Sequence, residues 1–206
     1  MPITLPVSIK SLKITSGPKQ TVFYPKVMQM TNQQMQRLIN TAIVYETQKL
    51  INEQVGNMPT TVKEMLGFYE IKNNQRQVLS LTFSNYTYHD QAAHGMTYLR
   101  SLTFDLKKGK QCQLRHLFKP EVDYMKKLSE IIKMQMKQRD IPLLHEFNTI
   151  KPNQDFYIAD KTIVIYFQLY EITPYVFGFP MFPISVYDIQ ELIDENGPLS
   201  RMAVND

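Results

Sequence analysis

Residues 89–95 combine two histidines, His89 and His94, with one aspartate, Asp90. Histidine titrates near neutral pH, so a loop of this composition could transfer protons or bind a metal ion. The spacing matches no known metal motif, and the sequence contains no HExxH. We interpret the segment first as a hairpin loop with one histidine hydrogen-bonded to its own backbone, and keep partner binding and metal binding or catalysis as alternatives.

The chain has one cysteine, Cys112, which excludes an internal disulfide and a cysteine-based zinc site. A catalytic thiol would need a histidine base within reach, and His116 follows four residues later. A helix long enough to bring the two together is not evident there. We therefore predict a half-buried structural cysteine at the end of a strand.

The loop predicted at residues 174–183 carries four aromatic residues between prolines and glycines: Tyr175, Phe177, Phe179 and Phe182. Aromatic side chains in loops are often binding anchors, because they offer a large contact area at low entropic cost. The alternatives are a lid over the core, a protein-binding surface and a sugar-stacking platform. Glu171 precedes the loop, but a single carboxylate gives little support to glycosidase chemistry, which needs a pair.

Composition and charge exclude several classes of protein. The chain has 206 residues, 43% hydrophobic and 20% charged, so disorder is not expected. A net charge of +4 is too small to indicate nucleic-acid binding. No nucleotide-binding glycine motif occurs, and we expect no cofactor and no metal site. No secretory signal or membrane-spanning stretch is recognisable, which predicts a cytoplasmic protein.

Two helices are predicted from apolar residues at helical spacing. The first covers residues 32–54, with Thr31 and Gln34 as a capping box and an end near Gly56 and Pro59. The second covers residues 121–138. Residues from Gly197 onward are expected to form a frayed tail.

Strands are predicted around these helices. Two strands share residues 6–30, with a turn at Gly17-Pro18, and a meander follows at residues 66–72, 77–88 and 96–106, with its first turn at Asn73-Asn74. Residues 156–158, 162–172 and 184–187 complete the set. This order predicts an α+β fold, a curved and mostly antiparallel sheet with two long helices packed on it. We expect one domain over residues 1–206, with a division into residues 1–58 and 59–206 as an alternative.

Three stretches together resemble a known family. They are residues 86–110, with Ala-His-Gly and Thr-Phe-Asp-Leu, residues 114–118, and residues 156–180, with Tyr-Glu-Ile-Thr-Pro-Tyr. The combination resembles the RsiV-like domain family, DUF3298, which is often paired with DUF4163. That family includes a lysozyme-sensing anti-sigma factor of bacilli and a module beside a peptidoglycan deacetylase.

The resemblance implies a non-catalytic sensor or binding domain from a Gram-positive bacterium. Its partner would be a protein, lysozyme included, or a cell-wall glycan, and its relatives act outside the membrane, which makes a spore or cell-surface location an alternative to the cytoplasm. The residues matched to the family motifs are His94, Gly95, Tyr170, Glu171, Pro174 and Tyr175, and the aromatic loop adds Phe177 and Phe179.

Two other functions remain open from the sequence. The first is a small hydrolase or amidase that uses His94 with Glu171 or Asp90, which requires these side chains to meet in one pocket. The second is a structural or spore-assembly protein that self-associates through the aromatic loop.

Overall fold

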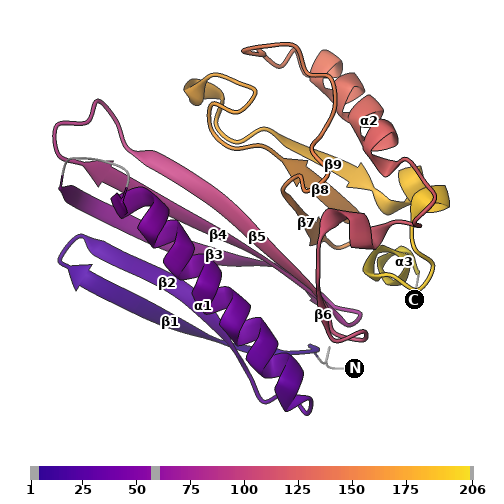
Figure 1. Ribbon diagram of the computed structural model, residues 1–206, viewed down its shortest axis with the longest axis horizontal. Helices are drawn as coiled ribbons and strands as arrows, with labels where there is room; N and C mark the ends of the chain where they lie inside the picture. Colours follow the sequence, from indigo (N-terminus) through magenta and orange to yellow (C-terminus); the bar gives the residue numbers. More distant parts are fainter. Residues whose placement is uncertain (1–4, 57–60, 205–206) are drawn as a thin grey trace.

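The computed structural model describes residues 5–56 and 61–204. The predicted stop at Pro59 and the alternative division after residue 58 lie outside these residues. The chain forms a six-stranded sheet in the order β1-β2-β3-β4-β5-β6 and a three-stranded sheet in the order β7-β8-β9. Helix α1 lies along the large sheet, and α2 belongs to the other part of the molecule (Figure 1). The α+β, mostly antiparallel fold class is confirmed.

The large sheet is built from the first half of the chain. Its strands are β1 (Ser8–Gly17), β2 (Gln20–Met28), β3 (Val62–Gln75), β4 (Val78–His89), β5 (Met96–Asp105) and β6 (Lys110–Cys112). Neighbouring strands are antiparallel except β2 and β3, which pair in parallel after the crossover through α1. The long hairpin β4–β5 ends in the histidine loop, so the strands hold this loop at one end of the sheet.

Helix α1 (Gln33–Gly56) covers one face of this sheet. Its buried residues Met35, Ile39 and Ile43 recur at helical spacing and pack with Leu79 and Leu81 of β4. The N-cap of the helix differs from the prediction. Thr31 was expected to cap the helix, but the Asn32 side chain accepts a hydrogen bond from the backbone amide of Met35 at 3.0 Å. Asparagine is a strong N-cap residue, and its position sets the start of the helix one residue later.

The second half of the chain builds its own core around the smaller sheet. The strands are β7 (Phe156–Ala159), β8 (Thr162–Tyr166) and β9 (Met181–Ser185), and the helices are α2 (Tyr124–Gln138) and α3 (Pro198–Ala203). Short 3-10 helices lie at Leu114–Leu117, Tyr175–Phe177 and Val186–Leu192. The two long helices therefore pack on different sheets, since Leu128 and Ile132 of α2 share a core with Ile163 and Ile165 of β8.

The smaller sheet contacts the large sheet on the face away from α1. Leu79 and Leu81 point toward α1, so the alternation of a strand turns Ser80 to the opposite face. There the Ser80 hydroxyl accepts the amide of Ile158 in β7 at 3.0 Å. The Ser101 hydroxyl donates to the Phe156 carbonyl at 2.5 Å. Polar side chains of one sheet thus bind the backbone of the other.

The predicted turn at Asn73-Asn74 is wrong. Both residues lie in β3, and the hairpin turns at Arg76 and Gln77, which have φ of 51° and 59°. Neither residue is a glycine or asparagine, so the usual signal for this turn is missing. The Asn74 side chain instead binds both backbone groups of Val7, at 3.3 Å to its amide and 2.8 Å to its carbonyl.

Two predictions for the C-terminal half are corrected. The strand predicted at residues 162–172 ends at Tyr166, because the residues after it turn away to form the aromatic loop. The frayed tail predicted from Gly197 is helix α3, whose Leu199 and Met202 are fully buried. Arg201 of this helix contacts the fully buried Asp105, with 2.6 Å between Nη2 and Oδ1, and also donates to the Arg76 carbonyl.

We predict that Arg201→Ala lowers the free energy of unfolding by about 3 kcal/mol, because it leaves the Asp105 carboxylate buried without its cation. Urea denaturation measures this change. Arg37→Ala is the matched control, since Arg37 is exposed on α1 and should change stability by less than about 0.5 kcal/mol. A loss at Arg201 no larger than the loss at Arg37 would contradict the role of this contact.

Candidate functional site

The structure brings the two predicted loops together. His94 and Gly95 end the loop between β4 and β5, Tyr170 lies in the loop after β8, and Tyr175 begins the 3-10 helix Tyr175–Phe177. The ring centroids of His94 and Tyr175 are 4.5 Å apart, those of Tyr170 and Tyr175 are 5.4 Å apart, and those of His94 and Tyr170 are 6.4 Å apart. We call His94, Gly95, Tyr170 and Tyr175 the loop cluster.

Hydrogen bonds fix the orientation of the rings in the loop cluster. His94 Nδ1 lies 2.9 Å from the Gly95 carbonyl oxygen, which can only accept, so the proton is assigned to Nδ1. Nε2 can then accept from the Tyr170 hydroxyl at 3.3 Å. The Tyr175 hydroxyl donates to the same Gly95 carbonyl at 3.1 Å. One backbone carbonyl therefore anchors a ring from each loop.

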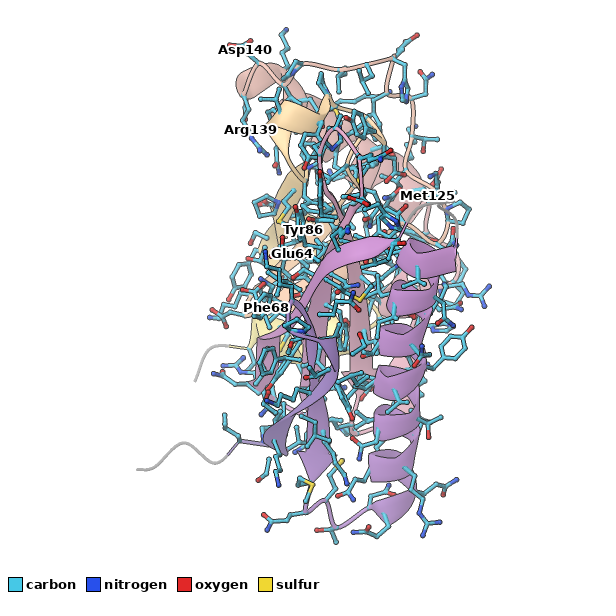
Figure 2. The ribbon with its side chains drawn as sticks, turned by 90° about the vertical axis from the view of Figure 1, so that its left-hand side faces the viewer. Glu64, Phe68, Tyr86, Met125, Arg139 and Asp140 are labelled. Carbon is cyan, nitrogen blue, oxygen red and sulfur yellow. The ribbon has the colours of Figure 1, made fainter. Side chains whose placement is uncertain are left out.

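A neighbouring aromatic ring leaves no room for a side chain at Gly95. Gly95 is buried, and a Cβ atom at this position would overlap the ring of Tyr86 in β4. The φ of Gly95 is not in the left-handed region. Glycine is therefore needed here because the ring approaches the backbone closely, and not because the backbone conformation is unusual. Burial raises the pKa of Tyr86, as do the nearby Glu64, Tyr175 and Tyr88. Figure 2 shows Glu64, Phe68 and Tyr86 on the side of the large sheet away from α1.

Tyr170 is held in an unusual backbone conformation. Its φ is 63°, in the left-handed region that bulky residues rarely adopt. Its side chain is 46% exposed, so burial of the ring does not explain the conformation. Such strain persists where the surrounding structure enforces it, and it often marks functional sites. Here it directs the hydroxyl toward His94.

The Gln168 side chain positions the aromatic loop on the large sheet. Its amide nitrogen donates to the Leu99 carbonyl at 2.7 Å, and its oxygen accepts the Leu99 amide at 3.1 Å. The same nitrogen lies 2.8 Å from Asp155 Oδ2. On the side of β5 away from β4, strand β6 pairs only with residues 103–105. Gln168 thus makes hydrogen bonds to the backbone amide and carbonyl of Leu99, which no neighbouring strand reaches.

Glu171 does not join His94. Its Oε2 accepts a hydrogen bond from the backbone amide of Gln168 at 2.8 Å, and its Oε1 lies 2.6 Å from Lys151 Nζ. Glu171 lines a cavity of about 270 Å³ beside Phe167, whereas His94 lines a different cavity of about 370 Å³. Asp90 pairs with Lys63 at 3.4 Å. The structure therefore does not assemble the acid–base pair that the hydrolase alternative requires.

The other aromatic residues predicted for this loop are buried to different degrees. Phe182 was predicted in the loop but lies in strand β9, where it is fully buried. Phe177 and Phe179 are partly buried against two separate core clusters. Pro174 precedes the 3-10 helix and is partly buried. Val176 at the tip is 91% exposed, a position that the sequence analysis did not single out.

The remaining candidates of the sequence have structural partners. His94, bonded to the Gly95 carbonyl, agrees with the prediction of a histidine bonded to the loop's own backbone. His89 is buried, and its Nε2 lies 2.7 Å from the Gln54 carbonyl at the end of α1. Cys112 is buried, and burial raises the pKa of its thiol to about 11. His116 Nδ1 accepts the Gln113 amide at 3.1 Å, while burial and two nearby cations lower its pKa.

Residues 5–56 and 61–204 contain neither a metal-binding cluster nor a helix that could span a membrane. No group of three or more His, Cys, Asp or Glu side chains there could hold a metal ion. None of the helices in this part of the chain is long and apolar enough to cross a membrane.

Residues 115–187 match DUF3298, a protein family of unknown function. The chain is 30% identical over 181 residues to the anti-sigma-V factor RsiV of Bacillus subtilis, a match that covers 82% of this chain and 63% of that protein. The RsiV-like resemblance is therefore confirmed.

A second relative is the peptidoglycan-N-acetylmuramic acid deacetylase PdaC of Bacillus subtilis. It is 26% identical over 134 residues, a match that covers 62% of this chain and 28% of the deacetylase. The chain thus spans less than two thirds of both curated relatives.

Solved structures share the whole fold: a DUF3298 member from Bacteroides fragilis has a TM-score of 0.70 at 14% identity, with 97% of this chain and 98% of that chain covered.

A DUF3298 protein from Pseudomonas aeruginosa PAO1 gives a TM-score of 0.69 at 12% identity and covers 99% of both chains. These likenesses concern the fold alone. Within this chain the DUF3298 match covers the smaller sheet and α2, so the loop cluster combines Tyr170 and Tyr175 from the matched region with His94 and Gly95 from outside it.

We predict that Tyr170→Gly is more stable than Tyr170→Ala by about 1 kcal/mol, because only glycine adopts a left-handed backbone without steric cost. Both substitutions remove the ring, so their difference reports the backbone alone. Chemical denaturation of the two variants measures it. If the alanine variant were the more stable one, Tyr170 would not hold this conformation in solution.

Proposed function

We propose that this DUF3298 chain is a non-catalytic binding domain that recognises a protein partner through the loop cluster. The observation that carries the proposal is the convergence of rings from two loops on one carbonyl group, that of Gly95. Tyr170 of the cluster is exposed, and so is Val176, which follows Tyr175 in the chain, so this surface offers both polar and apolar contact area. Tyrosines held in place by neighbouring groups are effective anchors, because little side-chain entropy remains to be lost on binding.

Two further facts support binding over catalysis. The groups that could act as acid and base are separated, with Glu171 engaged by Lys151 and Asp90 by Lys63. The relative with the longer match is an anti-sigma factor, a class of protein that acts by binding. The inward orientation of Phe177 and Phe179 also argues against self-association through an exposed aromatic loop.

The partner that we favour is a basic protein of the lysozyme type. The net charge of +4 opposes long-range attraction to such a protein. Locally, however, Glu64 pairs with Tyr88 across strands β3 and β4, and its charge raises the pKa of Tyr86, whose ring lies against Gly95. A partner's cation could pair with Glu64 on this face. A cell-wall glycan is the second candidate, because one curated relative is named for action on peptidoglycan and exposed rings such as Tyr170 can stack on sugars.

We predict that Tyr175→Ala weakens binding to the partner by at least about 2 kcal/mol, or roughly 30-fold, if Tyr175 is an anchor. The probes are purified animal-type lysozyme, measured by biolayer interferometry, and purified peptidoglycan sacculi, measured by co-sedimentation. Thermal unfolding of each variant confirms that the chain is folded.

The matched control is Tyr45→Ala, which removes a tyrosine that is 67% exposed on α1 and lies outside the loop cluster. Wild-type affinity in Tyr45→Ala with a loss in Tyr175→Ala supports the proposal. Equal affinities of Tyr175→Ala and the wild type, or equal losses in both variants, would contradict it. Binding by neither probe would exclude both partner classes.

A further inference from the structure

The first 45 residues of the chain carry positive charge without a compensating carboxylate. The first acidic residue of the sequence is Glu46, and five cations precede it: Lys10, Lys13, Lys19, Lys26 and Arg37. These five charges exceed the net charge of +4 of the whole chain. The positive charge is therefore concentrated at the N-terminal end of the sequence, chiefly in the hairpin of β1 and β2.

This hairpin forms the edge of the large sheet that lies away from the smaller sheet (Figure 1). Ile9 of β1 and Val27 of β2 pack in the core beneath α1. Because side chains alternate along a strand, the neighbouring Lys10 and Lys26 turn to the opposite face, where both are exposed. The lysines thus lie on a face of the sheet that α1 does not cover.

Lys10 and Lys26 stand directly opposite each other in the antiparallel pair of β1 and β2. Cβ atoms at such positions are about 5 Å apart, and like charges there destabilise a sheet. Neither lysine forms an ion pair with a residue that the structure describes. Lysines on an edge strand discourage pairing with other chains, which explains Lys10 but not Lys26 on the interior strand β2. An external anion would relieve the repulsion between the two.

Two aromatic rings are exposed on the same face as these lysines. Phe23 lies opposite Lys13 in the register of β1 and β2, so the two side chains share a face. The ring of Phe23 stacks on that of Phe68 in β3, with centroids 5.9 Å apart and planes inclined by 16°. Phe68 is 52% exposed and lies on the side of the sheet away from α1 (Figure 2). The surface therefore combines cations with exposed apolar rings.

We infer that this face of β1, β2 and β3 docks on a membrane surface that contains anionic phospholipids. The phosphate groups of such a surface attract nearby lysines, and exposed aromatic rings insert between the headgroups and the acyl chains. A soluble anionic polymer would pair with the lysines but would give the stacked rings no apolar environment. The combination of Lys10, Lys13 and Lys26 with Phe23 and Phe68 thus favours the membrane.

The docking face is separate from the loop cluster. Gln20 of β2 pairs with Met65 of β3, which in turn pairs with Thr87 beside the histidine loop. Lys26 lies six residues further along β2, which is about 20 Å at the rise of a strand. Residues 114–206 contain ten cations and thirteen carboxylates, a net charge of −3, so an anionic surface repels that part of the chain. Docking through the hairpin leaves the loop cluster accessible to a partner.

Co-sedimentation of the full chain with vesicles of phosphatidylglycerol and phosphatidylcholine tests the inference, and vesicles of phosphatidylcholine alone are the reference. We predict binding to the anionic vesicles only, and weaker binding as salt is added. The double variant Lys10→Gln, Lys26→Gln should bind about 25-fold more weakly, because each lysine near an anionic membrane contributes roughly 5-fold.

The double variant Lys133→Gln, Lys137→Gln is the matched control. It removes the same charge from two exposed lysines of α2 and should bind the vesicles as the wild type does. Phe68→Ser removes an exposed ring and no charge, and it should weaken vesicle binding at least about 5-fold. Thermal unfolding confirms that each variant is folded.

Three results would overturn the inference. The first is no binding of the wild type to anionic vesicles, and the second is an equal loss in the two double variants. The third is wild-type binding by Phe68→Ser, which would assign the lysines to a soluble anionic polymer. The inference goes beyond the proposed function and fails separately from it, because Tyr175→Ala should bind the vesicles as the wild type does.

Discussion

The bond between the Gln168 side chain and the backbone of Leu99 determines where the aromatic loop lies. Strand β6 is too short to reach Leu99, so no strand pairs with the outer amide and carbonyl of this residue. Gln168 binds both and in turn contacts Asp155. Because Gln168 comes two residues before Tyr170, this contact brings the tyrosines of the loop to His94.

Side-chain amides also make paired hydrogen bonds to backbone groups elsewhere in the fold. Asn40 of α1 binds both backbone groups of Val27, and Asn74 binds both of Val7. In each case a carboxamide, which carries a donor and an acceptor, replaces the pair of bonds that a neighbouring strand would make. The contacts of Asn40 and Asn74 lie within the large sheet and its helix, whereas the contact of Gln168 joins the large sheet to the second half of the chain.

Local patterns predicted much of the fold and only part of the site. The helix at residues 32–54 and the hairpin of β4 and β5 follow from periodicity, because each depends on nearby residues. Both loops were also predicted as candidates. Their meeting was not predictable, because it depends on Gln168 and Leu99, which are 69 residues apart. The turn at Arg76 was missed because its residues lack the usual turn chemistry.

Other residues of the site left no distinct signal in the sequence. Tyr86 looks like an ordinary member of an alternating strand, and its role is evident only when the close approach of Gly95 is known. The sequence also does not indicate the left-handed backbone of Tyr170, since tyrosine is not a residue that favours this conformation. Close contacts and strained positions result from tertiary structure, which a single sequence does not display.

The central claim is that Gln168 holds two distant loops together as one surface. Nuclear Overhauser effects between the ring protons of His94 and Tyr175, measured in the wild type and in Gln168→Ala, test it most directly. The account predicts clear effects in the wild type, where the ring centroids are 4.5 Å apart, and their loss or weakening in Gln168→Ala. Absence of these effects in the wild type, or their full retention in a folded Gln168→Ala variant, would contradict it.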